Sequence, residues 1–183
     1  PSMVREAWKL ASILRRNRYA KGALDLDFPE VRAVMDKDGH VTDIITEEYD
    51  ESHQLIEECM LAANEAVALT LKNRNRPTIY RVHEEPDSAK LFEFGQLCKL
   101  YGHPVHDIGQ RQYLNELMKS IKGSPDEQLL KLALLKSLMR ARYDTEPLGH
   151  YGLATANYCH FTSPIRRYAD LVVQRSLNPL RAN

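Results

Sequence analysis

One helical pattern, running without a break over residues 50–73, constrains the fold of this 183-residue chain more than any other feature. Acidic side chains crowd the start of the segment and basic ones crowd its end. This favours a helix, because each group interacts favourably with the opposite partial charge at that end of the helix. Apolar side chains recur along it at helical spacing and predict a buried stripe formed by Leu55, Ile56, Cys59, Met60, Ala63 and Val67. The rest of the chain must supply elements that cover this stripe.

The remaining segments predict a mixed α+β fold. Residues 31–35 and 41–45 alternate like strands around Asp38-Gly39, a pattern typical of a β-hairpin. Residues 77–83 alternate like one further short strand. Apolar residues at helical spacing predict helices over 4–18, 91–101, 113–121 and 124–142. We therefore predict a mostly helical α+β chain with a β-hairpin and one further short strand.

Composition narrows the possible partners. The 25 basic and 25 acidic residues give a formal net charge of zero, so any contact with nucleic acid must be local. Cys59, Cys98 and Cys159 are widely spaced and odd in number, which predicts reduced thiols and a cytoplasmic protein. No run approaches the roughly 18 apolar residues of a membrane span. We expect no membrane partner.

A short stretch near the end of the chain combines hydroxyl, proline and arginine side chains. Thr162 and Ser163 offer an N-cap and Pro164 suits the first helical position, so a helix is predicted to begin here. Arg166 and Arg167 then fall in its first turn, where positive charge opposes the helix dipole. Arginines beside hydroxyls and free backbone N–H groups suit a phosphate. The alternative at this point is that both arginines are solvated surface residues.

A longer signature surrounds this stretch. Its residues are Gly149-His150-Tyr151-Gly152-Leu153-Ala154, then Tyr158, then 160–175. This signature closely resembles the C-terminal part of the ribonuclease II / ribonuclease R family, whose members are processive 3′-to-5′ exoribonucleases that need a divalent metal. The resemblance runs from about Trp8 to Leu177. One departure is Gln174, where the family usually has histidine before the arginine at position 175.

The resemblance implies a role in hydrolysis of single-stranded RNA to nucleotides, with Arg166 as the catalytic residue that grips the phosphate near the scissile bond. It places Glu58 before the 3′-terminal nucleotides, where a carboxylate accepting from ribose 2′-hydroxyls would favour RNA over DNA. The other RNA-binding residues that it implies are Asn64, Tyr158, Thr162, Ser163 and Arg167. Arg167 points elsewhere on a helix than Arg166, and pairing with a carboxylate is its alternative role. Ile165 and Tyr168 are expected to pack.

The family's metal chemistry depends on a tight run of aspartates upstream of everything matched here. Hard cations such as Mg²⁺ need several carboxylate oxygens that converge on one point. This chain has no such run, and we interpret Asp25 and Asp27 as structural carboxylates. The resemblance therefore implies that residues 1–183 are the C-terminal half of a catalytic domain, without metal ligands, without the family's flanking RNA-binding barrels, and inactive alone.

Three expectations about partners follow. They are single-stranded RNA, the missing upstream half of the domain, and self-association through core surface that the half-domain leaves exposed. Two other functions stay open: a non-catalytic RNA-binding relative of the family, and a helical interaction module with no nucleic-acid role.

Overall fold

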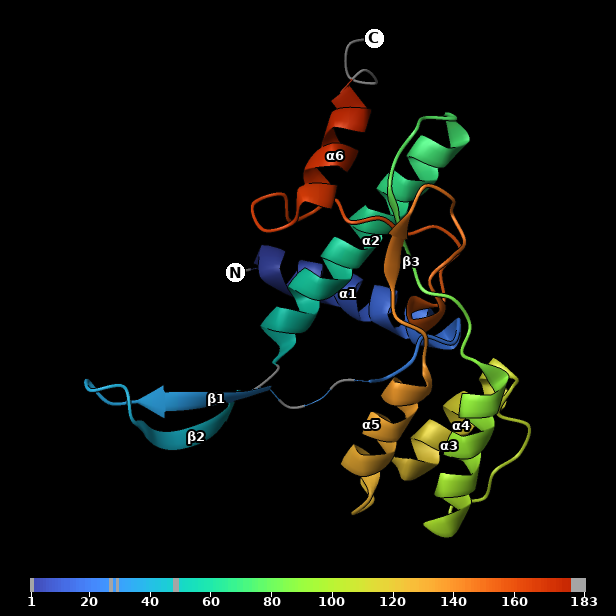
Figure 1. Cartoon of the computed structure of the whole chain (residues 1–183). Helices are drawn as coiled ribbons and strands as arrows, with labels where there is room; N and C mark the ends of the chain where they lie inside the picture. Colours follow the sequence, from blue (N-terminus) through green and yellow to red (C-terminus); the bar gives the residue numbers. More distant parts are fainter. Residues whose placement is uncertain (1, 27, 29, 48–49, 179–183) are drawn as a thin grey trace.

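The computed structural model describes residues 2–26, 28, 30–47 and 50–178, and these form an α+β chain (Figure 1). The helices are α1 Ser2–Ala20, α2 Glu51–Asn73, α3 Ser88–Leu100, α4 Arg111–Ile121, α5 Glu127–Ser137 and α6 Tyr168–Leu177. The strands are β1 Glu30–Met35, β2 Val41–Glu47, β3 Tyr80–Val82 and β4 Arg142–Asp144. The predicted fold class is confirmed. None of the described helices is long and apolar enough to cross a bilayer.

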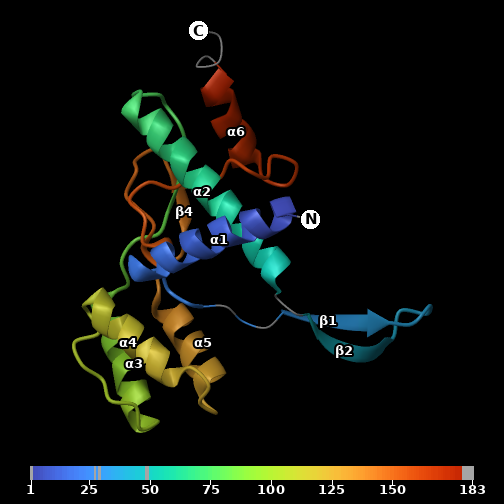
Figure 2. The same cartoon turned by 180° about the vertical axis from the view of Figure 1, so that it is seen from behind.

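Helix α2 is the axis of one lobe, in which α1 crosses it and β3, β4 and α6 lie nearby (Figures 1 and 2). The helix begins where the sequence predicts, because the Asp50 carboxylate accepts from the backbone N–H groups of Ser52 and His53 at 2.9 and 3.2 Å. This N-cap satisfies two donors that the first helical turn would otherwise leave without partners.

The buried face of α2 differs from the predicted stripe. The residues that it buries are Glu58, Leu61, Asn64, Ala68 and Leu71, whereas Ile56 and Cys59 are exposed. The prediction was wrong because it rested on the spacing of apolar residues alone, which leaves Glu58 and Asn64 out of a buried face. A polar side chain can be buried when partners from other segments satisfy it, and these two have such partners, described below.

The second lobe is the packed trio of α3, α4 and α5. Its core contains the residues predicted from helical spacing, among them Phe94, Leu114, Leu117 and Ile121. The last helix of the trio is shorter than predicted: α5 ends at Ser137. Residues 142–144 leave it and pair with β3 instead, in antiparallel register with Tyr80 opposite Asp144. Helical spacing could not reveal this, because strand β4 owes its conformation to a partner some sixty residues upstream.

The hairpin of β1 and β2 extends away from both lobes in both views. Its turn is closed by Asp36, which accepts from the backbone N–H groups of Asp38 and His40 at 2.9 Å each. One face carries exposed apolar side chains, since Val31, Met35, Val41 and Ile44 are each 58–67 % exposed. A two-stranded hairpin with a bare apolar face is marginally stable by itself.

We predict that this face drives self-association of the isolated chain. Replacing Ile44 by lysine should shift a concentration series in light scattering toward the monomer, because a charge in the apolar contact is costly to bury. Asp43→Lys is the matched control, since position 43 lies next to Ile44 on the opposite face and should leave the distribution unchanged. A wild-type chain that stays monomeric at every concentration would contradict the prediction.

Candidate nucleic-acid interface

The first part of the signature folds against the residue that follows β3. The His83 N–H donates to the Gly149 carbonyl at 3.0 Å, and the His83 carbonyl accepts from the Tyr151 N–H at 2.7 Å. The Gly152 N–H donates to His83 Nδ1 at 3.0 Å. A β-carbon at position 152 would lie 3.1 Å from that same nitrogen, which explains why glycine stands there. These bonds fix the start of the signature to the sheet.

An aromatic row follows from this contact. The rings of His83, His150, Tyr158, His160 and Tyr143 meet edge to face in that order, with centroids 5.0, 5.3, 5.8 and 5.7 Å apart. Burial lowers the pKa of His150 to about 3 and that of His160 to about 4, with neighbouring His83 and Arg167, respectively, as the next causes. Burial lowers the pKa of His83 as well. The histidines are therefore neutral at neutral pH and bring no positive charge to an RNA strand.

Asn64 joins α2 to the middle of the signature. Its Nδ2 donates to the Tyr158 hydroxyl at 3.1 Å, and its Oδ1 accepts from the Phe161 N–H at 3.0 Å. Gln174, the departure from the family pattern, donates from Nε2 to the Phe161 carbonyl at 3.1 Å. Asn64 and Tyr158 are thus brought together as predicted site residues, but both are buried. The bonds described here hold the segment in place, and contact of either residue with RNA stays a prediction.

The last helix begins later than predicted. Pro164 and Arg166 belong to a turn, and α6 starts at Tyr168 without a side-chain N-cap. The N–H groups of Arg166 and Arg167 both donate to the Ser163 carbonyl, at 3.3 and 3.2 Å. The Ser163 N–H donates not to a hydroxyl but to a carboxylate, that of Asp170, at 2.7 Å. The N–H groups of Arg166 and Arg167 are thus satisfied by the Ser163 carbonyl, so the hydroxyl caps predicted from the sequence are not used.

The two arginines have different surroundings. Arg167 donates through Nε and Nη2 to both oxygens of Asp170, at 2.8 and 2.9 Å, as its alternative role required. Arg166 is exposed, and no residue of the described ranges forms a hydrogen bond or ion pair with its guanidinium. Its charge is the smallest of the causes that lower the pKa of His160, after burial, Arg167 and Arg81. Arg166 is therefore the cation of this turn that remains available to a ligand.

The neighbours of Arg166 are also exposed. Ile165 and Tyr168 were expected to pack and do not, since their side chains are 102 % and 72 % exposed. The Thr162 hydroxyl oxygen is buried and has no hydrogen-bond partner among the described residues. The turn thus exposes one cation and two large side chains to solvent.

Glu58 is held by α1. Its carboxylate is 2 % exposed and accepts from Arg18 Nε at 3.1 and 3.3 Å, with a further bond from Arg18 Nη2. The sequence analysis missed this pair, because Arg18 and Glu58 lie 40 residues apart and no local pattern links them. An RNA contact by Glu58 stays a prediction, and a nucleotide would have to share the carboxylate with Arg18.

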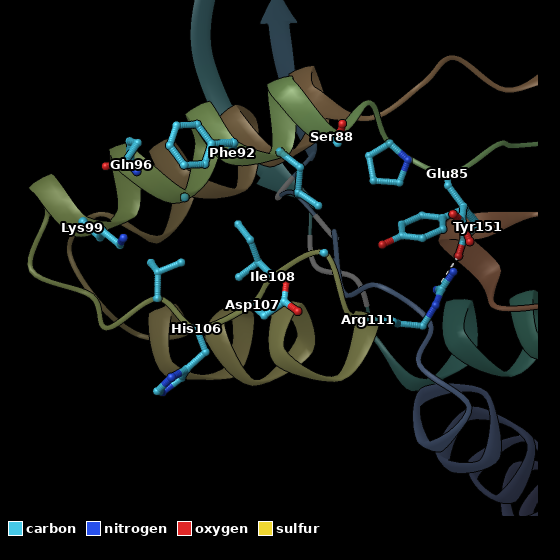
Figure 3. Close-up of a pocket in the computed structure, with 15 residues that line it drawn as sticks. Glu85, Ser88, Phe92, Gln96, Lys99, His106, Asp107, Ile108, Arg111 and Tyr151 are labelled. Carbon is cyan, nitrogen blue, oxygen red and sulfur yellow. Dashed lines mark hydrogen bonds between the residues drawn. The ribbon is translucent and has the colours of Figure 1, made fainter.

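Two hollows flank the signature. A groove of about 470 Å³ runs along α2, and its lining includes Asn64, Tyr158 and Arg167 together with Ile56 and Met60. A cavity of about 500 Å³ lies between α3 and the loop before α4, and Tyr151 forms one of its walls (Figure 3).

Arg111 ties this second cavity to the signature. Its guanidinium lies over the Tyr151 ring, 3.9 Å from the centroid, and its Nη1 donates to the carbonyls of Gly22 and Tyr151 at 3.0 and 2.7 Å. Sequence reasoning did not single out Arg111, because a lone arginine at a helix start carries no local signal of such a role.

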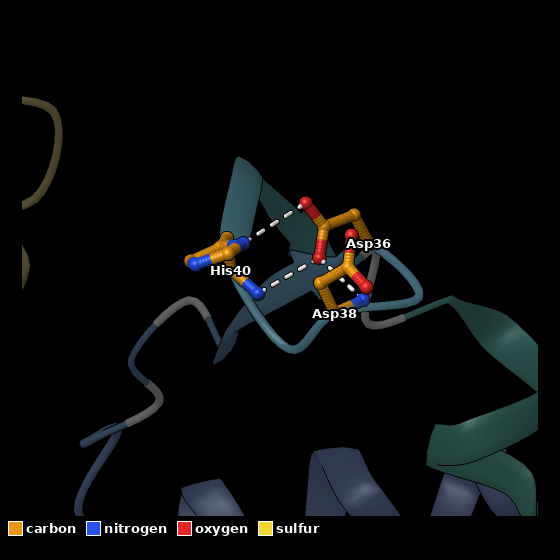
Figure 4. A group of neighbouring side chains, drawn as sticks. All are labelled: Asp36, Asp38 and His40. Atoms are coloured by element: carbon orange, nitrogen blue, oxygen red, sulfur yellow. Dashed lines mark hydrogen bonds and ion pairs between the residues drawn. The ribbon is translucent and has the colours of Figure 1, made fainter.

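Metal-binding chemistry is sparse in the described residues. Their one group of three side chains able to share an ion is Asp36, Asp38 and His40, all exposed in the turn of the hairpin (Figure 4). Backbone bonds already account for Asp36 there. Asp25 pairs with Lys122 at 3.0 Å, in agreement with a structural role, and Asp27 lies outside the described residues.

Within the described residues, the site is a turn held by Asp170 in which Arg166 has no partner, and it lies beside neutral aromatic rings and a groove. The family is shown directly: the RNB domain model matches residues 2–182, and the chain belongs to this family. The resemblance found in the signature is confirmed.

Similar proteins and solved structures support the same family. The chain is 39 % identical to Ribonuclease R of Thermotoga maritima over 182 residues, which is 96 % of this chain and 25 % of that protein. It is 38 % identical to Ribonuclease R of Aquifex aeolicus over 171 residues, covering 92 % and 24 %. The chain thus spans about a quarter of the length of these relatives.

The structure of Mycoplasma genitalium RNase R in complex with ribose methylated single-stranded RNA matches with a TM-score of 0.89 at 30 % identity, over 95 % of this chain and 28 % of that one. Yeast Ssd1, described as a pseudonuclease, matches with a TM-score of 0.64 at 27 % identity, over 73 % and 17 %.

We predict that the aromatic row makes the fold acid-sensitive. In the unfolded chain a histidine binds its proton near pH 6.5, but in the fold His160 and His150 do so only near 4 and 3. The unfolded state therefore binds more protons in this window, and the free energy of unfolding falls as the pH drops from about 6.5 towards 4. Urea titrations at pH 7.5, 6 and 5 measure this.

His160→Asn is the informative variant, because the asparagine amide takes the place of His160 Nδ1, which bonds the Tyr143 hydroxyl at 2.8 Å, but cannot be protonated. Its stability should fall less steeply with pH than that of the wild type. Equal stability of the wild type at pH 7.5 and 5 would show that the histidines do not control it.

Proposed function

We propose that this chain is a portion of a metal-dependent, hydrolytic 3′-to-5′ exoribonuclease that degrades single-stranded RNA to nucleotides. In this proposal the chain supplies phosphate-contacting residues to the parent enzyme. Membership of the RNB family and identities of 32–39 % to Ribonuclease R proteins over most of the chain support it. So does the presence of single-stranded RNA in the complex of the Mycoplasma RNase R. A cytoplasmic location belongs to the same proposal.

The observation that carries the proposal is the contrast between Arg166 and Arg167. The guanidinium of Arg167 is committed to a buried carboxylate, whereas that of Arg166 is exposed and unpaired within the described part of the chain. A preorganised guanidinium stabilises negative charge that develops on a phosphate during hydrolysis. Arg166 is accordingly the proposed catalytic residue. In this proposal Ser163, Thr162 and Arg167 contact phosphate from the same turn, Asn64 and Tyr158 contact RNA from the groove along α2, and Glu58 does so from the same helix.

The described residues do not provide a site for Mg²⁺ beside Arg166. A hard divalent cation needs several converging carboxylate oxygens, and the buried carboxylates of Asp170 and Glu58 are each bonded to an arginine instead. We therefore propose that Mg²⁺ in the parent enzyme is held by residues other than those described here, in an upstream half of the catalytic domain. The isolated chain would then bind RNA without cleaving it.

A non-catalytic RNA-binding relative is the second candidate. The likeness to yeast Ssd1 favours it, because that structure is described as a pseudonuclease and still matches with a TM-score of 0.64. The aspartates of the longer protein would decide between the two. The third possibility, a helical interaction module, predicts no salt-dependent affinity for RNA.

We predict that Arg166 makes a phosphate contact that salt weakens. With 5′-fluorescein-labelled single-stranded RNA, Arg166→Ala should lower the slope of log affinity against log salt concentration by about 0.7, the loss expected for one phosphate contact on a single strand. Lys136→Ala, which removes an exposed cation at the end of α5, is the matched control. Equal slopes for Arg166→Ala and the wild type would remove Arg166 from the interface.

We predict that the same substitution in the longer parent enzyme lowers turnover about 10²–10³-fold, as for loss of one preorganised donor to the transition state. Folding should be unaffected, because Arg166 bonds to no described side chain. Single-turnover release of nucleotides in Mg²⁺, with urea unfolding of both proteins, measures the two effects. Near-normal turnover would refute the catalytic role.

A further inference from the structure

We propose that Asp170 is the positioning residue for Arg166: it fixes the turn so that the exposed guanidinium meets a phosphate of the RNA strand. This inference rests on the proposed function. It concerns a residue that touches no ligand and acts through the backbone that carries Arg166.

One carboxylate binds both ends of this turn. Asp170 Oδ1 accepts from the Ser163 N–H at 2.7 Å and from Arg167 Nη2 at 2.9 Å, while Oδ2 accepts from Arg167 Nε at 2.8 Å. Arg166 therefore lies between two residues that are anchored to the same side chain. Asp170 itself is 0 % exposed and belongs to the first turn of α6, so the anchor moves with a helix rather than with a loop.

The anchored serine is held at both of its backbone polar atoms. Its N–H is bonded to Asp170, and its carbonyl accepts from the N–H groups of Arg166 and Arg167. The backbone at position 166 cannot rotate without breaking a bond to Ser163 or leaving a buried charge without its partners. Both changes are strongly unfavourable inside a protein.

The segment before the turn is fixed independently. Asn64 and Gln174 hold the two backbone polar groups of Phe161, from α2 and α6 respectively. Removing Asp170 should therefore free residues 163–167 without releasing the segment that precedes them. A buried ion pair contributes little net stability once its desolvation is counted, so its effect here is to orient.

The test is a double-mutant cycle on RNA affinity with Arg166→Ala, Asp170→Asn and the double variant. Asparagine keeps the shape and one acceptor but cannot serve Ser163 and both Arg167 donors together. We expect about tenfold weaker binding for Arg166→Ala, from loss of a charge-assisted hydrogen bond. We expect about fivefold weaker binding for Asp170→Asn, and for the double variant an affinity within about twofold of Arg166→Ala, because the two residues act as one unit.

The matched control is the same aspartate-to-asparagine change at a carboxylate outside the candidate interface. Asp38→Asn serves this purpose better than Asp107→Asn, because Asp107 lines the cavity beside Tyr151, whereas Asp38 is an exposed carboxylate in the turn of the hairpin and should leave RNA affinity unchanged. Losses that add in the double variant would mean that Asp170 supports RNA binding without acting through Arg166, and would overturn the proposal. Full affinity in Arg166→Ala would instead refute the proposed phosphate contact, which is a different failure.

Amide hydrogen exchange without RNA gives a reading that does not depend on the proposed function. Asp170→Asn should speed exchange at Ser163 and Arg166 but not at Leu71, in the buried face of α2. Unchanged exchange at Ser163 overturns the positioning role whatever the RNA result. If Asp170→Asn does not fold, Arg167→Lys replaces it: lysine keeps the charge but loses the fork, and about twofold weaker binding is expected, with no further loss beside Arg166→Ala.

Discussion

The polar face that α2 turns inward is the constraint on which this structure depends. Glu58 binds Arg18 of α1, and Asn64 binds the hydroxyl of Tyr158 and the backbone of Phe161. Because a buried charge or amide is costly without partners, α2 can bury this face only when α1 and the signature segment are both in place. The long helix, the first helix and the functional segment are thus folded as one unit around two polar side chains.

The sequence predicted well the features that depend on neighbouring residues, and poorly those that depend on contacts with other residues in the fold. The Asp50 cap and the Asp38-Gly39 turn need only their neighbours in the chain, and both the helix start and the hairpin were correct. Three predictions were wrong: the buried face of α2, the end of the helix that precedes the strand β4, and the start of α6. The buried face of α2 and the strand β4 are decided by partners far away in the chain, such as Tyr80 opposite Asp144, whereas the start of α6 is decided by the bonds of Ser163 and Arg167 to Asp170. Spacing alone carries no record of such a partner.

The candidate site shows the same contrast between what the sequence could predict and what depends on contacts in the fold. The signature located the functional segment, and the structure separates its two arginines into one that is exposed and one that is bonded to Asp170. Sequence reasoning left that pairing open for Arg167 but could not name the carboxylate, and it had no signal for Arg111 or for the Arg18–Glu58 pair. The contacts of Arg111 and the Arg18–Glu58 pair join residues that lie at least 40 positions apart in the sequence. The family, in contrast, follows from the residues themselves.

Arg111 has a consequence for how the chain unfolds. It begins α4 in the helical lobe, and its guanidinium is bonded to the carbonyls of Gly22 and Tyr151. Tyr151 and Leu24, which follows Gly22 by two residues, both belong to the core of that lobe. The helical trio therefore cannot lose its packing without releasing the start of the signature, nor the signature move without opening the trio. The two lobes should melt in one cooperative transition, with a calorimetric enthalpy equal to the van't Hoff value.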